Sequence, residues 1–202
     1  MERLISEGAE ASVYEDRLLG LRVIRKVRRA KRYRHPELDR RLRSSRTKME
    51  ASILLRARGA GVPCPAVLDV RGYVLTIEEV EGETLMSFLR RSDPQGALSV
   101  GVKLGEAVGR LHSAGVAHND LTPVNVIVSP EGVRLIDFGL AKFTRDVEDF
   151  AVDLHVLLKS VESLCPSPEF SRGVLEGYSR TFARWREVLR RVEDIERRGR
   201  YR

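Results

Sequence analysis

The amino-acid sequence predicts an α+β fold in two lobes: a small strand-rich lobe with one long helix, then a reduced, mostly helical lobe. Up to residue 80, short runs with alternating or β-branched residues stand between glycine turns, which is typical of strands. Within that part, the charged stretch 36–58 opens at a proline and stops at glycines, as a helix does. Beyond residue 81, apolar residues recur mostly at helical spacing. We therefore place the lobes at 1–80 and 81–202.

The first lobe is expected to contain five strands around its helix. In chain order they are predicted at 3–7, 11–15, 19–26, 66–70 and 73–79. Glu81-Gly82 interrupts the pattern and is the candidate hinge.

The second lobe is expected to begin with a short helix that Thr84 caps. A helical stripe of Leu and Val from Leu98 to Leu111 follows. Later elements are predicted as a hairpin of 126–128 with 133–136, and helices at 147–164, 168–181 and 182–198.

Composition limits the class of protein. An apolar content of 42% and a charged content of 32% over 202 residues favour a globular chain, and no apolar run is long enough to span a bilayer. Two cysteines predict neither a disulfide framework nor a metal knuckle. Without a cleavable apolar signal at the start, we expect a cytoplasmic protein.

Positive charge is clustered, and the net charge is +7. One basic block runs from Arg22 to Lys48 and another from Arg180 to Arg202. Such blocks suit RNA or an acidic protein surface, but solvated helix faces give the same pattern.

The most informative motif is His118-Asn119-Asp120-Leu121-Thr122-Pro123-Val124-Asn125, followed by Asp137-Phe138-Gly139. Asp120 is the candidate base or orienting group for an attacking oxygen, and Asn125 and Asp137 are candidate metal ligands. The chain has only two Asn, and both lie in this loop. An Asx-turn loop that leads into a strand and a glycine turn is the structural alternative.

Order and spacing in this motif resemble the catalytic loop and metal-binding motif of protein kinases. The resemblance implies ATP and Mg²⁺ as cofactors. In the third predicted strand, Val23-Ile24-Arg25-Lys26 lies where a kinase carries Val-Ala-Ile-Lys, so Lys26 is expected to reach the α- and β-phosphates. Glu50 in the long helix is the expected partner of Lys26, although alone it would be an ordinary partner of Arg46.

The expected phosphate-covering loop contains Gly8, Ala9, Glu10 and Ala11. It has one glycine where the protein-kinase pattern has three, which predicts a less close approach of backbone to phosphate. Glu10 also adds negative charge there. By itself this loop would be a plain hairpin turn.

The remaining nucleotide contacts are expected from strand ends. Strand alternation places Ile24 on the same face as Lys26, where it could cover an adenine. Glu78 and Val80 are candidates to offer backbone groups to that base. On the long helix, Met49, Ile53 and Leu54 are expected to pack inward.

Three other positions in the second lobe carry expectations. Thr122 stands where Ser/Thr protein kinases carry a Lys, which predicts slower protein phosphorylation, another acceptor, or water. His118 is interpreted as a structural residue that organises the loop. Asp153 is expected to hold the backbone of the catalytic loop. Nothing like Ala-Pro-Glu follows Asp137-Phe138-Gly139, which disfavours a regulated signalling kinase.

The whole chain resembles the small atypical kinase/ATPase subunit of the KEOPS complex. The strings that carry this resemblance are Lys31-Arg32-Tyr33-Arg34-His35-Pro36-Glu37-Leu38-Asp39, Arg46-Thr47-Lys48-Met49-Glu50-Ala51, Gly8-Ala9-Glu10-Ala11, Asp120-Leu121-Thr122, Glu148-Asp149-Phe150-Ala151-Val152-Asp153-Leu154 and Arg198-Gly199-Arg200-Tyr201-Arg202. Two positions depart from that family: Asn119 and Phe150 stand where it usually has Gly and Lys. Asn tolerates the left-handed backbone that Gly adopts.

The resemblance implies ATP hydrolysis or Ser/Thr phosphorylation in support of N6-threonylcarbamoyladenosine formation at position 37 of tRNA. It implies a partner threonylcarbamoyltransferase, other KEOPS subunits, and tRNA bound through the basic surface and the C-terminal tail. One alternative is a kinase-fold scaffold that binds tRNA and its partner with little catalysis. Another is a small-molecule kinase, disfavoured because few residues follow Asp137 to enclose an acceptor.

Overall fold

Five antiparallel strands form the sheet of the first part of the chain, in the order β1-β2-β3-β5-β4. The computed structural model describes residues 2–8 and 10–199. The strands are β1 (Arg3–Glu7), β2 (Ala11–Leu18), β3 (Leu21–Arg28), β4 (Val67–Arg71) and β5 (Val74–Glu78). All five predicted strands are confirmed. The third begins later than predicted, because Leu19 and Gly20 both adopt positive φ and make the turn before it.

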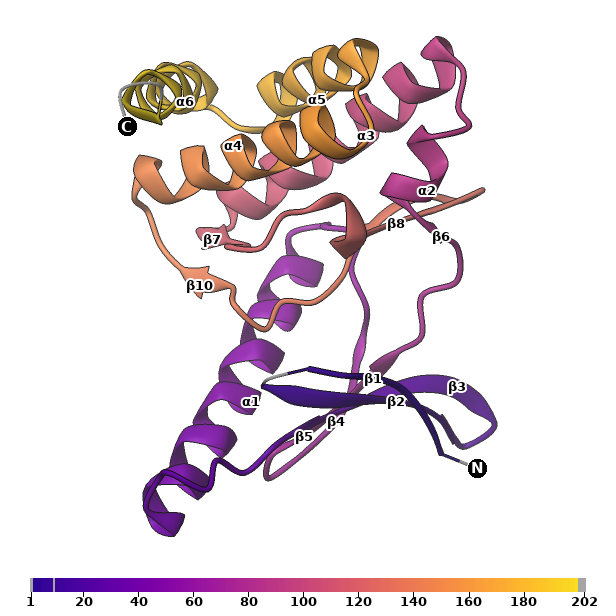
Figure 1. Cartoon of the computed structure of the whole chain (residues 1–202), viewed down its shortest axis with the longest axis vertical. Helices are drawn as coiled ribbons and strands as arrows, with labels where there is room; N and C mark the ends of the chain where they lie inside the picture. The colour runs from indigo at the N-terminus through magenta and orange to yellow at the C-terminus, as the bar shows by residue number, and fades with distance from the viewer. Residues whose placement is uncertain (1, 9, 200–202) are drawn as a thin grey trace. The chain divides into compact units, whose positions relative to one another are not determined.

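One long helix, α1 (Pro36–Gly59), follows β3 (Figure 1). Its buried face carries Glu50, Ile53, Leu54 and Ala57. The prediction that Met49 packs inward is wrong, since that side chain is 48% exposed. The buried face follows a spacing of three and four residues from Glu50, and Met49 lies outside it.

The chain divides into two compact units. The first runs to Leu55 and resumes over Pro65–Val80, and the second takes Arg56–Cys64 and the chain from Glu81 onward. The last turn of α1 and the loop after it therefore belong to the second unit.

The second unit is largely helical but carries small sheets. Its strands are β6 (Glu83–Thr84), β7 (Val116–Ala117), β8 (Val126–Ser129), β9 (Gly132–Leu135) and β10 (Lys142–Phe143), and its helices are α2 (Leu85–Leu89), α3 (Pro94–Ser113), the 3₁₀ turn η1 (Pro123–Asn125), α4 (Val147–Leu164), α5 (Pro168–Thr181) and α6 (Trp185–Gly199). Thr84 caps α2 as predicted, by accepting from the Ser87 N–H. The last helix starts later than predicted because Phe182 is the C-cap of α5.

Two helices of the second unit, α3 and α5, pack unusually closely (Figure 1). A Cβ on Gly105 would overlap the carbonyl of Val174, and one on Gly177 would overlap the carbonyl of Val102. Gly101 and Gly173 have the same constraint against the facing helix, and a Cβ on Gly109 would overlap the Thr181 hydroxyl. Small residues at these positions let the two backbones approach, and the core of the unit forms around them.

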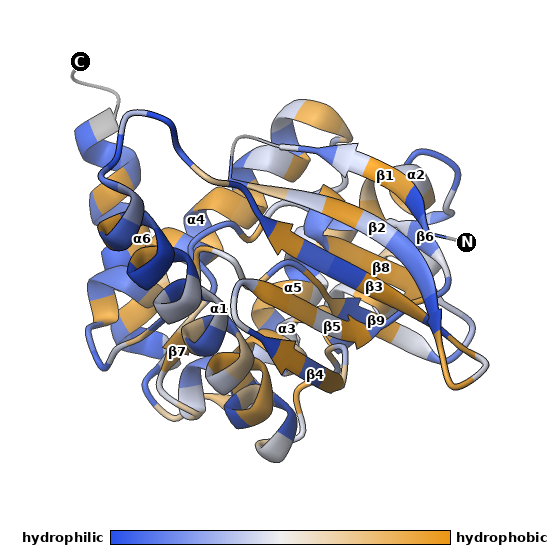
Figure 2. Ribbon diagram, turned by 90° about the horizontal axis from the view of Figure 1, so that it is seen from below, coloured by the Kyte–Doolittle hydropathy of each residue, from blue (hydrophilic) through white to orange (hydrophobic). Residues whose placement is uncertain are grey.

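The last helix, α6, packs on α4 and is strongly amphipathic. Val188 and Val192 are its buried residues, and most of its surface is hydrophilic (Figure 2). Among the described residues, no helix combines the length and apolarity that crossing a membrane requires.

Candidate active site

In the first unit, Lys26 and Glu50 form a buried ion pair. The Lys26 Nζ donates to Glu50 Oε1 at 2.6 Å, from the middle of β3 to the buried face of α1. Glu50 is 4% exposed. The predicted pairing of Lys26 with Glu50 is therefore confirmed. An ammonium held in this way can bind phosphate oxygens.

Glu50 also accepts from a second cation that sequence reasoning missed. The Nη2 atom of Arg28 donates to Glu50 Oε2 at 2.5 Å, and Arg28 is buried. Strand alternation was the available signal, because Arg28 is two residues after Lys26 and therefore on the same face of β3. Each oxygen of the Glu50 carboxylate therefore accepts from one cation.

The predicted phosphate-covering loop is a tight turn between β1 and β2. The Gly8 N–H donates to the Ala11 carbonyl at 2.9 Å, and Ala9 lies outside the described residues. A Cβ on Gly8 would make only an ordinary contact, so its surroundings do not demand glycine. The Glu10 carboxylate pairs with Arg46 at 2.6 Å, which offsets the negative charge expected there.

The other predicted nucleotide contacts of this unit lie on β3 and at the end of β5. Ile24 is half-buried and stands opposite Ile77 in the sheet. Glu78 donates its N–H to the Ala66 carbonyl at 2.9 Å, and its carboxylate accepts the Ala66 N–H. Val80 is half-buried just after β5.

In the second unit, Asp120 and Asn125 are held together by the turn between them. Asn125 Nδ2 donates to Asp120 Oδ2 at 2.8 Å and to the Asp120 carbonyl at 2.9 Å. The 3₁₀ turn η1, which begins at Pro123, brings the two residues to this distance. Because the side-chain nitrogen of Asn125 makes these two bonds, its side-chain oxygen points away from Asp120. That oxygen is a hard ligand of the kind that Mg²⁺ prefers.

Asp137 follows β9 with a left-handed backbone, φ 59°. Its Oδ1 accepts the Gly139 N–H at 3.2 Å. A non-glycine residue in this region is strained, and such strain is common where a side chain must be aimed at a ligand. A carboxylate here and the Asn125 oxygen fit the donor set of a magnesium ion. Groups of three or more His, Cys, Asp or Glu with metal-binding geometry are absent from the described part of the chain.

His118, in the catalytic loop, is fully buried. Burial lowers its pKa below the usual range, and the charges of Asp153, Asp137 and Asp120 only partly oppose this shift. Its Nε2 donates to the Ile136 carbonyl at 3.0 Å, and its ring packs on Phe138 with 4.8 Å between centroids. His118 is therefore a neutral residue that joins the catalytic loop to the segment before Asp137, as the structural interpretation predicts.

Asp153, on α4, holds the catalytic loop as predicted. It accepts the His118 N–H at 2.6 Å and the Asn119 N–H at 2.7 Å. Asn119 has φ 60°, so it adopts the left-handed backbone that its replacement of glycine requires, and its side chain donates to the Leu140 carbonyl. The position of Asp120 thus depends on a carboxylate in another element.

Behind Asp153 lies a buried chain of hydrogen bonds that the sequence did not reveal. His112 Nε2 is 3.2 Å from Asp153 Oδ2, and His112 Nδ1 is 2.8 Å from the Tyr178 hydroxyl. Burial, with the charge of Asp153, raises the pKa of Tyr178, so its hydroxyl keeps its proton and donates to His112. His112 then donates from Nε2 to Asp153, and α3, α4 and α5 are joined beneath the loop.

Comparison with known proteins gives the same motif set a wider context. A family profile described as "Protein kinase domain" matches residues 6–170. Among solved structures, "WaaP in complex with acyl carrier protein" superposes with a TM-score of 0.71 and covers 100% of this chain and 88% of that chain. At 19% identity this likeness concerns the fold alone, and the predicted α+β fold class is confirmed.

Curated relatives are much more similar in sequence. The "KEOPS complex subunit Bud32" of Pyrococcus abyssi is 41% identical over 99% of this chain and 96% of that protein. The "Probable serine/threonine-protein kinase BUD32 homolog" of Archaeoglobus fulgidus is 41% identical over 89% and 88%.

A longer kind of relative is equally similar over this region. The "Probable bifunctional tRNA threonylcarbamoyladenosine biosynthesis protein" of Methanothermobacter thermautotrophicus is 41% identical over 98% of this chain and 36% of that protein. This chain therefore spans little more than a third of the length of the bifunctional relatives.

Proposed function

This chain belongs to the Bud32 family of atypical protein kinases, and we propose that it uses Mg-ATP for phosphoryl transfer, as an ATPase or Ser/Thr kinase. One observation carries the proposal. Asn125 binds Asp120 through its amide nitrogen, so one short turn supplies both a carboxylate base for the attacking group and a neutral oxygen for a metal.

Each residue of the candidate site has a distinct task in the proposed reaction. Lys26, aligned by Glu50, binds the α- and β-phosphates, and Arg28 holds the other oxygen of Glu50. Asn125 and Asp137 would hold Mg²⁺, which when bound offsets the charge of the phosphates. Asp120 orients the attacking hydroxyl or water and accepts its proton.

The adenine contacts remain part of this proposal. We assign the phosphate-covering turn to Gly8, Ala9, Glu10 and Ala11. Ile24, with Glu78 and Val80 at the end of β5, is assigned to the base. The Glu10–Arg46 pair supports this assignment, because it reduces repulsion between the turn and a triphosphate.

We further propose that the reaction serves N6-threonylcarbamoyladenosine formation in tRNA, with a threonylcarbamoyltransferase and other KEOPS subunits as partners. The names of the relatives support this assignment. The exposed arginines of α6 support a contact with tRNA. Arg190 makes no ion pair within the described part of the chain, whereas Arg197 and Arg198 are partly offset by Asp194 and Glu148. The tail residues after Gly199 that we predict to reach the partner lie outside the described residues.

The direct test is ATP turnover by Asp120→Ala, with and without the partner transferase and tRNA. Loss of a general base typically lowers the rate by about 10²–10⁴-fold, and we expect that loss with partner binding retained. Asp93→Ala is the matched control, because Asp93 only caps α3 through the Gly96 N–H. Turnover at the wild-type rate in Asp120→Ala would refute phosphoryl transfer by this loop and favour the scaffold alternative.

A salt titration addresses the tRNA part separately. Each phosphate contact adds about one unit to the slope of log affinity against log salt concentration. A salt-dependent tRNA affinity that Asp120→Ala leaves unchanged supports both parts together. A tRNA affinity that does not vary with salt would remove the electrostatic contact.

A further inference from the structure

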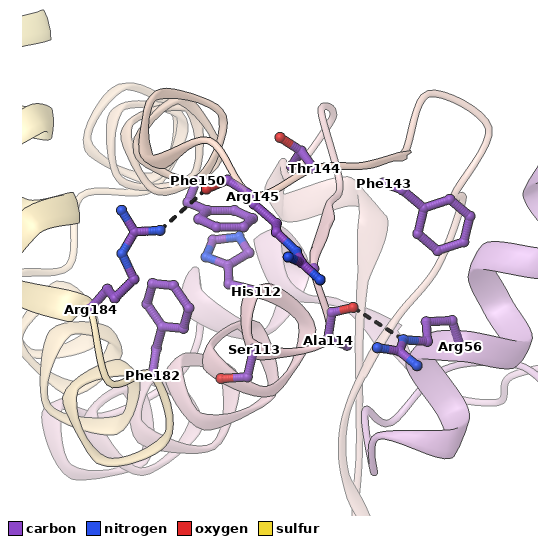
Figure 3. Close-up of a pocket in the computed structure, with 11 residues that line it drawn as sticks. Arg56, His112, Ser113, Ala114, Phe143, Thr144, Arg145, Phe150, Phe182 and Arg184 are labelled. Atoms are coloured by element: carbon purple, nitrogen blue, oxygen red, sulfur yellow. Dashed lines mark hydrogen bonds between the residues drawn. The ribbon is translucent and has the colours of Figure 1, made fainter.

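A pocket lined by none of the candidate active-site residues lies wholly within the second unit. Its volume is about 780 Å³, within the size range of small-molecule sites. Its walls come from the end of α3, the segment Phe143–Arg145 after the catalytic motifs, the start of α4, the link between α5 and α6, and Arg56 (Figure 3). None of the residues assigned above to ATP or Mg²⁺ lines it.

The lining of this pocket is cationic. Arg56, Arg145 and Arg184 line it, and none of its lining residues is acidic. In Figure 3, Arg184 and Arg56 enter from opposite sides and Arg145 lies between them. Three guanidinium groups around one hollow repel one another, and an anion between them relieves that repulsion.

Two of these arginines are positioned by backbone carbonyls. Arg56 Nε donates to the Ala114 carbonyl at 3.2 Å, and Arg184 Nη1 donates to the Arg145 carbonyl at 3.2 Å. A carbonyl bond fixes a guanidinium but leaves its charge uncompensated. Arg184 also pairs with Glu187 and feels the charge of Asp146, so its own charge is partly offset.

Arg145 has no ion-pair or hydrogen-bond partner for its side chain in the described part of the chain. The nearby acids are engaged elsewhere: Asp146 caps the Glu148 N–H, and Asp149 pairs with Lys142. Arg145 is therefore the cation of the pocket most available to a ligand.

An aromatic ring stands beside these charges. Phe143 lines the pocket and is 49% exposed, whereas Phe150 and Phe182 are buried against His112. An exposed ring next to several guanidinium groups is the combination that binds a nucleotide, since the base stacks and the phosphate takes charge-assisted hydrogen bonds.

We propose that this pocket binds a nucleoside phosphate, either free or as one nucleotide of an RNA strand, at a site separate from that for ATP. The phosphate is taken by Arg145 with help from Arg56 and Arg184, and the base lies on Phe143. This site does not depend on phosphoryl transfer, so it can hold or fail independently of the proposed activity.

The test is calorimetric titration of the full chain with uridine 5′-monophosphate, with a non-hydrolysable ATP analogue and Mg²⁺ present throughout. We expect saturable binding that Arg145→Ala weakens about tenfold or more, the value of one charge-assisted hydrogen bond. Phe143→Ala should weaken binding of uridine monophosphate but not of inorganic phosphate. Arg172→Ala, which removes the same charge from an exposed position on α5, should bind as the wild type does.

A second arm separates the two sources of the nucleotide. If a short oligouridylate binds more tightly than the mononucleotide and loses affinity in Arg145→Ala, the natural ligand is RNA. If it binds no more tightly, the ligand is a free nucleotide. Absence of saturable binding, or equal loss in Arg145→Ala and Arg172→Ala, would overturn the proposal.

Discussion

Two buried carboxylates, one in each unit, are held by opposite kinds of partner. Glu50 is 4% exposed and accepts from two cationic side chains, Lys26 and Arg28. Asp153 is 1% exposed and accepts from two backbone N–H groups and from His112. Cationic side chains can be exchanged together with the acid they pair with, but a backbone N–H cannot be removed. We therefore expect that apolar residues can replace the charged side chains of the Glu50 cluster with little loss of unfolding free energy. The same replacement at Asp153 should cause a large loss.

The largest effect is expected for Asp153→Ala. The change leaves the buried N–H of His118 and the half-buried N–H of Asn119 without their acceptor, at about 1–3 kcal/mol each. We expect the free energy of unfolding to fall by about 3–5 kcal/mol and ATP turnover to be lost. Urea unfolding followed by circular dichroism measures the first quantity.

Two further variants give reference values for the loss of unfolding free energy in Asp153→Ala. Asp153→Asn retains one acceptor oxygen and should lose about half as much free energy. Asp149→Ala, on the same helix, removes contacts only with Lys142 and Thr144 near the surface and should cost about 1 kcal/mol or less. A loss in Asp153→Ala no larger than in Asp149→Ala would contradict the role assigned to Asp153.

The Glu50 cluster is tested by a double change. Glu50→Leu alone leaves Arg28 buried without its counter-charge and should cost about 3 kcal/mol. Adding Arg28→Met removes that charge and should restore about 1–2 kcal/mol, although ATP turnover stays low because Glu50 no longer positions the Lys26 ammonium. Strictly additive losses in chemical denaturation would show that the two residues are not coupled.

The free energy of unfolding is expected to depend on pH through His118, whose N–H is bound by Asp153. The Glu50 cluster contains no histidine, so this effect belongs to the Asp153 cluster alone. Burial lowers its pKa below the usual 6.5, so the unfolded chain binds a proton that the folded chain does not. This contribution to stability is complete above about pH 6.5 and is lost as the pH falls below that value, by up to about 1.4 kcal/mol per pH unit.

The comparison is made with His118→Gln, whose amide can still donate to the Ile136 carbonyl. Unfolding free energies measured between pH 7.5 and 5.5 should fall less steeply in this variant than in the wild type. His35→Gln, at an exposed position, should leave the wild-type slope unchanged. Identical slopes in all three proteins would exclude His118 as their source.

A local backbone effect is expected at Asn119. Asn119→Ala must adopt φ 60° without a favourable side chain and also loses the bond to Leu140, for a cost of about 1–2 kcal/mol. Asn119→Gly loses only the bond and should cost less. If glycine proves the more disruptive replacement in thermal unfolding, the backbone conformation is not the reason for Asn at this position.

The sequence predicted the parts of the site whose spacing is local. Asp120 and Asn125 are five residues apart, and one turn determines how they meet. The Lys26–Glu50 pair was predicted through a known motif pattern, because nothing local joins a strand to a helix across 24 positions. Asp153 was placed correctly from the polarity of one position on an otherwise apolar helix face.

Other features could not be predicted from periodicity. Met49 and Glu50 are adjacent, and only the packed structure decides which of them turns inward. His112 and Tyr178 are 66 residues apart and meet through tertiary packing, so no sequence window contains both. The three arginines of the cationic pocket also come from separate segments, so no sequence window contains them all.

The glycines between α3 and α5 set the distance between these two helices. Gly109 and Gly177 bring the two helix axes near enough for the phenol at 178 to span the gap to the imidazole at 112. One added methyl group would lengthen that gap and loosen the support beneath the loop, although nothing in the motif itself had changed. Residues with no reactive group can therefore govern the reaction from a distance, and loss-of-function substitutions should appear at them.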